Sequence, residues 1–397
     1  MSLRSLKREM LIVFLLLSFV SLFADMTYEG ARSVFGSYAE VLGATALCAS
    51  LANIGEFLGY ATRLASGVAV ARSRSSTGYW LMVFLGYALN LLAVPLLALA
   101  GYWQLAVTLI FFERIGKGLR TPARDTILAE VTEEVGRGKA FGLHETLDQA
   151  GAVLGPLAVS VSLHLSGNSY TITFLLLALP AATSMILLYV AYRKYPRLKA
   201  VERPLLRGKS ALPEIFWFYV LASSIMALGF IHWVNVSYYL KAEDLLADPL
   251  IAVMYLVAML VDGVMALPIG LLYDKVGPLS LLIAPISSIL IVPLLLTKAF
   301  ALVVVSSALW GVVMGVYEGI ARAFVADITP PEGRAFGYGI FGAFFGFSWM
   351  LGSITYGYLH QSRPDCMAWF SIACNVSALT CLTVISLKAG RGRGWHR

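Results

Sequence analysis

Charged residues are scarce in this chain, since Asp, Glu, Lys and Arg make up 13% of its 397 residues. A soluble globular domain carries about 25%, so the composition excludes an ordinary soluble enzyme. Cysteine is scarce too, and the four present, Cys48, Cys366, Cys374 and Cys381, form no Cys-x-x-Cys pair. We expect these cysteines to be apolar packing residues, and their spacing implies neither a disulfide framework nor a metal site. A Gly-x4-Gly-Lys-Ser/Thr nucleotide-binding motif is missing, which argues against direct use of ATP.

Hydrophobic residues, by contrast, make up 59% of the chain and come in long runs. A helix that crosses a bilayer needs about 20 mostly apolar residues, and twelve segments meet this need. The first follows basic residues as in a signal peptide, but no small-residue cleavage site comes after it, so we interpret it as an uncleaved span. We therefore expect an all-α membrane protein with spans at 10–36, 43–70, 79–100, 103–121, 139–165, 170–192, 214–240, 249–272, 279–297, 299–324, 334–360 and 366–387.

Basic residues gather in alternate connections between these spans, whereas the opposite connections hold only Lys241, Lys298 and Arg363. Because basic loops stay in the cytoplasm, both termini are expected on the cytoplasmic side. The protein itself is expected in the plasma (cytoplasmic) membrane. This distribution also accounts for the net charge of +7 without a nucleic-acid partner. The longest and most basic connection, 193–213, predicts a cytoplasmic linker between two six-helix halves, 1–192 and 214–397.

A short pattern recurs in the two halves. The first half reads Ala-Glu-Val-Thr at 129–132 and Gly-Lys-Ala-Phe-Gly at 138–142. The second half reads Ala-Asp-Ile-Thr at 326–329 and Gly-Arg-Ala-Phe-Gly at 333–337. Each copy lies between the fourth and fifth span of its half, which indicates two parallel repeats of common ancestry.

Three further motifs occupy comparable places. The turn after the eighth span reads Gly-Leu-Leu-Tyr-Asp-Lys-Val-Gly at 270–277, and its counterpart after the second span has Ala71 where the acid belongs. An Arg-x-x-x-Gly motif begins at Arg114 in the fourth span, and glycines at 142, 151 and 155 precede a proline in the fifth. Together these motifs resemble the major facilitator superfamily, and the resemblance covers essentially the whole chain. Two other stretches are similar to a poorly characterised prokaryotic subgroup.

The resemblance implies twelve transmembrane helices in two pseudo-symmetric bundles that carry a small solute by alternating access. In the family, the fourth-span arginine is linked to proton coupling and the fifth-span motif to antiporters. The resemblance also implies that glycine at 270 permits close helix contact. It further implies that Asp274 caps a helix start and pairs with a nearby basic residue. The Ala71 departure puts the corresponding latch of the first half in doubt.

Ionisable residues inside a membrane cost about 2.5–3.5 kcal/mol each, so those within the spans are candidates for function. By depth and resemblance, the candidates for proton coupling are Asp25, Glu56, Glu113, Arg114 and Asp148. Those for a substrate cavity are Glu29, Arg32, Lys117, His144, His232, Asp262, Trp310 and Tyr317. Those for gating or motif packing are Gly67, Arg72, Arg120, Arg124, Gly151, Gly155, Pro156, Gly270, Asp274, Lys275, Gly277, Glu318 and Arg322.

The first half holds most of these charges and the second holds more aromatic residues in its cavity spans, which suggests proton handling in one and substrate stacking in the other. The function that we expect first is proton-coupled export of a small solute. The expected partners are the lipid bilayer, a small-molecule substrate and protons, and the expected oligomeric state is a monomer. A symporter that imports a charged or polar metabolite is the alternative. An intramembrane enzyme is more distant, because the helix that begins at His144 has Asp148 where a zinc-protease helix needs a second histidine. No cofactor or metal is expected.

Overall fold

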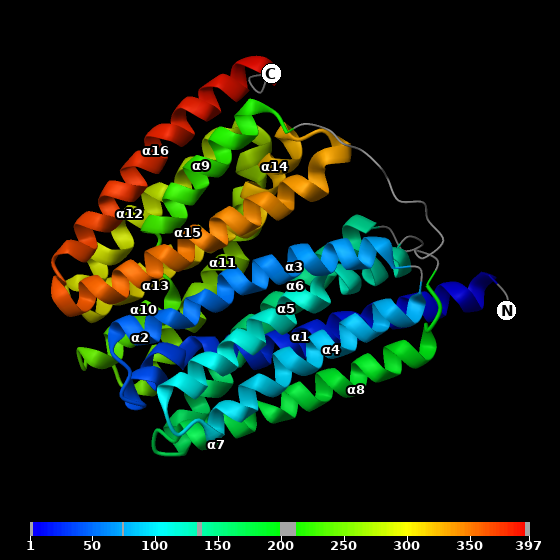
Figure 1. The fold of residues 1–397 in the computed structure, drawn as a ribbon, viewed down its shortest axis with the longest axis horizontal. Coiled ribbons are helices and arrows are strands. Elements are labelled where there is room, and N and C mark those ends of the chain that lie inside the picture. The colour runs from blue at the N-terminus through cyan, green and yellow to red at the C-terminus, as the bar shows by residue number, and fades with distance from the viewer. Residues whose placement is uncertain (1–2, 74, 133–136, 199–211, 394–397) are drawn as a thin grey trace. The chain divides into compact units, whose positions relative to one another are not determined.

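The computed structural model describes residues 3–73, 75–132, 137–198 and 212–393, and every regular element in them is helical (Figure 1). This confirms the all-α prediction. The elements of the first half are α1 (Leu3–Val41), α2 (Ala46–Ser50), η1 (Leu51–Asn53), α3 (Ile54–Arg72), α4 (Ser76–Leu96), η2 (Leu97–Leu99), α5 (Trp103–Val131), α6 (Arg137–Leu165), α7 (Tyr170–Leu176) and α8 (Ala178–Lys194). Those of the second half are α9 (Glu214–Gly229), α10 (Trp233–Ala242), α11 (Asp248–Val276), η4 (Gly277–Leu282), α12 (Ile283–Leu296), α13 (Phe300–Val316), η5 (Tyr317–Ala321), α14 (Arg322–Ile328), η6 (Pro331–Gly333), α15 (Arg334–Ser362) and α16 (Cys366–Arg393).

Twelve membrane spans follow from these helices. Eight stretches of the described chain are long and apolar enough to cross a membrane, and one of them, Asp248–Leu296, has 49 residues. Because a span needs about 20 residues, this stretch contains two spans, α11 and α12. The helices α3, α5 and α6 supply the remaining three, and their lower hydropathy reflects the charged residues that they carry. The predicted set of twelve spans is thus confirmed.

Several helices differ from the predicted spans in their ends and continuity. The fourth span was predicted at 103–121, whereas α5 continues to Val131 and includes the hydrogen-bonded pair Arg124 and Asp125. The seventh, predicted as continuous over 214–240, is broken between α9 and α10. The tenth, predicted at 299–324, is interrupted by the π-helical turn η5. Residues 199–211 of the predicted linker lie outside the described residues.

The chain packs as two compact units. Unit 1 comprises residues 1–34 and 58–205, and unit 2 comprises residues 35–57 and 206–397. The end of α1, together with α2, η1 and the start of α3, therefore belongs with the helices of the second half. The predicted halves, 1–192 and 214–397, describe the sequence repeat, and the units describe packing.

In unit 1, α5 packs against two neighbouring helices through glycines. A Cβ atom added to Gly116 would lie 2.9 Å from the Cα atom of Asn90 on α4. One added to Gly118 would lie 3.0 Å from the backbone nitrogen of Arg63 on α3. Close backbone approach through small residues is the usual way in which helices associate inside a membrane. The charged face of α5 is thereby held in a fixed place among α1, α3 and α4.

In unit 2, side chains of other helices fill the break between α9 and α10. The carbonyl oxygen of Phe230 accepts a 2.9 Å hydrogen bond from the indole nitrogen of Trp349 on α15. The next carbonyl, that of Ile231, accepts one of 2.9 Å from Trp310 on α13. Unpaired backbone groups are very costly in lipid, so these two indoles allow the seventh span to be discontinuous.

Candidate functional site

The first part of the candidate site lies where α1 and α6 meet in unit 1. A Cβ atom on Gly155 would lie 2.9 Å from the backbone nitrogen of Gly30, and one on Gly151 would lie 3.1 Å from the Cβ atom of Asp25. Only glycine allows this approach without a shift. Asp148, one turn before Gly151 on α6, interacts electrostatically with Asp25. The two carboxylates predicted for proton coupling on separate spans are therefore neighbours.

Asp25 also has a polar and a cationic neighbour. The hydroxyl group of Tyr28 donates a hydrogen bond to its carboxylate, and the ammonium nitrogen of Lys117 lies 4.2 Å from the centre of the Tyr28 ring. Lys117 is also 3.9 Å from the carboxylate of Glu29, which pairs with Arg32 at 3.1 Å. Acids and bases of α1 and α5 thus form one cluster.

Asp148 lies beside His144 and interacts electrostatically with Arg124, which is hydrogen-bonded to a serine. The Nε2 atom of His144 is 3.6 Å from its carboxylate, and the other ring nitrogen of His144 is 3.1 Å from the hydroxyl of Ser18. Arg124 donates 2.8 and 3.0 Å hydrogen bonds to Asp125 and one of 2.9 Å to Ser21 on α1. Within the described residues, the Oδ1 atom of Asp148 is buried without a hydrogen-bond partner. One oxygen of this carboxylate is thus available for a proton.

Arg120 is the most deeply buried charge near this cluster, with 1% of its surface exposed. Its guanidinium carbon lies 4.0 Å from the ring centre of Tyr87 and 5.9 Å from that of Tyr28. In the part of the chain that the structure describes, its Nε and Nη1 atoms have no hydrogen-bond partner. The aromatic faces compensate part of the cost of this charge, and two of its donors are left unused.

The predicted Glu113–Arg114 pair is present but faces α4. The Nε atom of Arg114 lies 3.0 Å from the Glu113 carboxylate. The other carboxylate oxygen accepts a 2.7 Å hydrogen bond from Asn90, which also donates to the Glu113 carbonyl at 3.1 Å. Asn90, which the sequence reasoning did not single out, holds this acid at the α4–α5 interface. A proton-coupling role for the pair stays a prediction.

Glu56 and His232, also predicted, meet in unit 2. The Nε2 atom of His232 lies 3.5 Å from the Oε1 atom of Glu56. Next to them, Ser353 on α15 accepts a hydrogen bond from Asn53 and donates one to Asn235. Asn235 and Ser353 were not predicted, because nothing in the sequence shows that positions up to 300 residues apart lie together.

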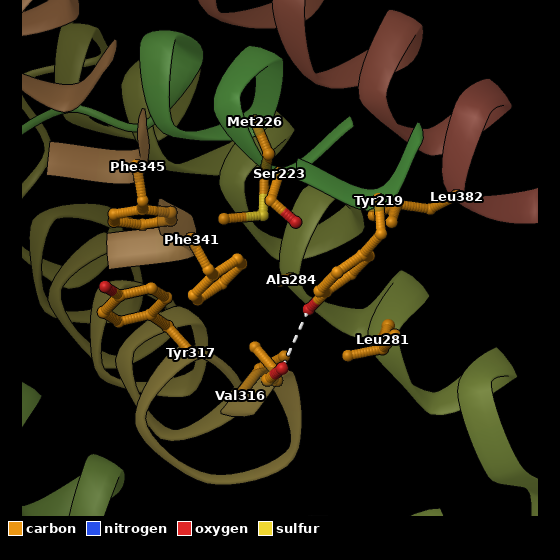
Figure 2. Close-up of a pocket in the computed structure, with 11 residues that line it drawn as sticks. Tyr219, Ser223, Met226, Leu281, Ala284, Val316, Tyr317, Phe341, Phe345 and Leu382 are labelled. Carbon is orange, nitrogen blue, oxygen red and sulfur yellow. Dashed lines mark hydrogen bonds between the residues drawn. The ribbon is translucent and has the colours of Figure 1, made fainter. Parts of the chain in front are cut away.

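A small pocket with about 20 Å³ of free space lies inside unit 2 (Figure 2). The rings of Tyr317 and Phe345 stack on one side of it with centroids 3.8 Å apart. On another side Tyr219 stacks on Phe341 at 5.5 Å and donates a 3.1 Å hydrogen bond to the carbonyl of Ala321, which ends the π-helical turn. Trp310, the other predicted cavity aromatic, is instead buried against the helix break.

The remaining predicted positions have varied surroundings. Two expectations for the 270–277 motif are wrong: a Cβ atom on Gly270 would meet no described atom within 4 Å, and Asp274 is exposed in the last turn of α11, where it caps no helix start. Gly270 needs no close contact because its side of α11 is open. Gly277 ends α11 with φ +61°. Of the other predicted positions, Arg72 and Lys275 are exposed and Glu318 is half-buried. Gly67 is in ordinary contact with Pro122, and Pro156 lies inside α6. Asp262 is buried beside Gly315, and Arg322 lies 5.9 Å from the ring centre of Tyr317.

Metal ligation has no support in the described residues, which contain no group of three or more His, Cys, Asp and Glu side chains placed to hold an ion. The site is a set of ion pairs and carboxylates inside spans. Such a set can bind and release protons or a charged solute.

Comparison with known proteins gives concordant results. A family model described as Major Facilitator Superfamily matches residues 14–245 and 230–390. An uncharacterized protein of Mycobacterium tuberculosis is 36% identical over 376 residues, which are 93% of this chain and 91% of the relative. An uncharacterized MFS-type transporter of Methanocaldococcus jannaschii is 27% identical over 364 residues, 88% of this chain and 89% of the relative.

Two solved structures share the fold. The nucleoside transporter NupG has a TM-score of 0.71 at 15% identity, with 94% of this chain and 98% of that chain covered. A mutant of the peptide transporter POT in complex with sulfate has a TM-score of 0.74 at 14% identity, with 95% of this chain and 94% of that chain covered. At these identities the likeness concerns the fold alone.

Proposed function

Because this chain belongs to the major facilitator superfamily, we propose that it is a secondary transporter that exchanges protons for a small solute by alternating access. Its family and its apolar helices make it a multi-pass membrane transporter, and we propose in addition that it is coupled to protons and exports its solute. In such a cycle two repeats expose a site near the membrane midplane to one side at a time. The chain's own acids then bind protons on one side and release them on the other.

The observation that carries the proposal is the neighbourhood of Asp25 and Asp148 at the glycine-mediated contact between α1 and α6. Two carboxylates that interact at one site disfavour the state in which both are charged. Charges inside a membrane are also costly unless they are paired. A proton bound by either Asp25 or Asp148 relieves both costs, and a shift of α1 against α6 changes how firmly that proton is held.

Nearby cations supply the alternative partner. Lys117 and Arg124 already contact the cluster through Tyr28 and Ser21. Arg120 is buried with unused donors within the described region. When a movement of α5 brings one of these cations to Asp25 or Asp148, the carboxyl group releases its proton, and the cation stabilises the carboxylate that is left. Arginine in particular stays charged throughout, because its guanidinium group does not lose its proton in proteins.

Export is the direction that we propose, on the basis of the fifth-span glycine motif and its resemblance to antiporters. The basic residues of alternate loops support a cytoplasmic location of both termini. Import of a charged metabolite together with protons is the second candidate. It is favoured by Lys117, whose side chain is 37% exposed beside Glu29 and could bind an anionic group of a solute.

Substrate contacts are proposed for the aromatic side chains of unit 2. Tyr317 and Phe345 stack at the pocket and present flat apolar faces, which suit aromatic or apolar parts of a solute. The division of tasks then follows the two packing units, with protons handled by unit 1 and cargo contacted by unit 2. Trp310 and Trp349, whose indoles hold the helix break, are proposed to fix the position of these contacts.

The experiment uses the purified full chain in liposomes that contain a pH-sensitive dye. Cationic drugs, nucleosides, dipeptides, sugars and amino acids are added one at a time under an imposed pH gradient. We expect at least one class to evoke proton movement. Asp25→Asn and Asp148→Asn should abolish this movement, and Asp365→Asn, at an exposed loop residue, should leave it unchanged.

Two outcomes would contradict the proposal. Proton movement of wild-type size in both cluster variants would exclude Asp25 and Asp148 as carriers. Uptake of a probe that proceeds at the same rate with and without a pH gradient would exclude proton coupling altogether.

A further inference from the structure

The break in the seventh span contains a histidine in an unusual position. His232 precedes α10 and is its N-cap residue, with φ −76° and ψ 147°. Its ring nitrogen Nδ1 accepts a 3.2 Å hydrogen bond from the backbone nitrogen of Val234. Serine, threonine, aspartate and asparagine usually fill this role. None of these four can lose its acceptor within the physiological pH range, whereas histidine can.

The hydrogen bonds of His232 fix which nitrogen carries the proton. Because Nδ1 accepts from Val234, its lone pair is free of a proton, and the neutral ring must carry its hydrogen on Nε2. That atom lies 3.5 Å from the carboxylate oxygen Oε1 of Glu56. The ring is 3% exposed and contacts the indole of Trp349, with ring centroids 4.4 Å apart.

We propose that His232 is a proton-binding site that couples protonation to the structure of the helix break. A proton taken up from water binds the lone pair on Nδ1 and makes both ring nitrogens donors. The Val234 N–H then faces another N–H and loses its acceptor, so the first turn of α10 must rearrange or the ring must turn. At the same time the positive charge strengthens the contact between Nε2 and the Glu56 carboxylate.

The surroundings of the ring support this assignment. Facing His232 are Glu56 from α3 and the indole of Trp349 from α15, and the next polar groups along α10 and α15 are the amide of Asn235 and the hydroxyl of Ser353. Of these groups only Glu56 carries an ionisable side chain, and its Oε1 atom is the one that lies 3.5 Å from the Nε2 atom of the ring. The indoles that bind the Phe230 and Ile231 carbonyls do not change with pH, so the first turn of α10 is the part that responds.

This site is separate from the carboxylates of unit 1 and goes beyond the proposed function. It does not need Asp25 or Asp148, and it predicts a structural change with pH in the absence of any solute. Its failure and the failure of the proposed coupling site are therefore distinguishable in one set of variants.

The test is hydrogen–deuterium exchange of the full chain in lipid nanodiscs, at about pH 5 and about pH 8, on either side of the ordinary histidine pKa of about 6.5. Protection factors are corrected for the pH dependence of intrinsic exchange. In the wild type, we expect protection of the amides at the start of α10 to fall roughly 5-fold at the lower pH, the factor expected for loss of a typical N-cap. Protection in α13 serves as the internal reference.

His232→Asn is the matched variant, because asparagine caps a helix well and does not titrate. It should keep high protection at both pH values, and Glu56→Gln should move the wild-type transition to lower pH. Asp25→Asn and Asp148→Asn should leave the transition in place. Equal protection of the wild type at both pH values, or the same fall in His232→Asn, would overturn the proposal.

Discussion

The hydroxyl group of Tyr28 donates a hydrogen bond to the carboxylate of Asp25 one turn earlier on α1. The face of the same ring lies under the ammonium group of Lys117. A single tyrosine thus contacts an acid and a base of the cluster through two different parts of its side chain. Substitution by phenylalanine removes the first contact and keeps the second.

Tyr28→Phe is therefore expected to change proton binding more than stability. Loss of the donor destabilises the carboxylate of Asp25 relative to its protonated form, so the midpoint of proton-coupled transport should move to higher pH. The cost in unfolding free energy should stay near 1 kcal/mol, the value of an ordinary hydrogen bond. Transport in liposomes as a function of pH is the measurement. Tyr102→Phe, at an exposed tyrosine, is the control, and an unchanged midpoint in Tyr28→Phe would argue against Asp25 as a carrier.

Gly277 and Gly270 form a matched pair within one motif. Gly277 has φ +61° and ψ −141°, a region open essentially to glycine alone, so Gly277→Ala should cost about 1–3 kcal/mol. Gly270 lies inside α11 with open space at its Cα, so Gly270→Ala should be neutral or should stabilise by up to about 1 kcal/mol. Thermal unfolding of both variants in detergent is the check. Equal effects of the two substitutions would contradict the backbone assignment.

Glu243, in the connection after α10, is the group from which we expect a dependence of stability on acid. The ammonium group of Lys298, 2.6 Å away, together with a weaker contribution from His360, holds the pKa of Glu243 below its ordinary value of 4.5. Because the folded-state pKa is the lower one, the interaction stabilises the fold above about pH 4.5 and is lost as the pH falls through the folded-state value.

Lys298→Ala tests this dependence. Lys298 has φ +62°, and alanine bears the same backbone strain, so the variant reports the lost charge. Its melting temperature should lie below that of the wild type near neutral pH, and the gap should close as the pH falls through the folded-state pKa of Glu243. A gap that stays constant under acid would show that the pair does not titrate with folding.

Glu113 and Arg114 provide a test of the second candidate site in unit 1. Glu113→Gln and Arg114→Ala should abolish transport driven by a pH gradient, and solute exchange without a gradient should survive at least in part. The reason is that the guanidinium favours the ionised form of the neighbouring carboxylate. Without Arg114 the acid can bind a proton but lacks the cation that makes it release the proton, and without Glu113 the acid itself is absent. Full gradient-driven transport in both variants would assign the pair to packing with Asn90 alone.

The spans could be predicted from the sequence, because they depend on local composition. The break at Phe230–His232 could not be predicted, since the residues that permit it, Trp310 and Trp349, follow by 79 and 119 positions. The contact of Glu56 with His232 depends on the packing of the start of α3 within unit 2.

The repeat shows a similar limit. Glu130 and Asp327 occupy equivalent places in the two copies, and each accepts a hydrogen bond from a tyrosine, Tyr195 at 2.5 Å and Tyr273 at 2.6 Å. One tyrosine follows α8 and the other lies in α11, so only the structure shows this shared use of the acid. Gly270 is the opposite case, because the family motif predicts a close contact that its open surroundings do not require.

The central claim is that Asp25 and Asp148 carry the transported proton, and infrared spectroscopy of the carboxyl groups tests it without any solute. The carbonyl stretch of protonated carboxyl groups is followed in lipid-reconstituted protein as the pH is lowered from about 8 to about 5, above the ordinary aspartate pKa of about 3.9. The account predicts a band that grows over this range in the wild type and in Asp365→Asn and is lost in Asp25→Asn and Asp148→Asn. A band of undiminished size in both cluster variants would contradict it.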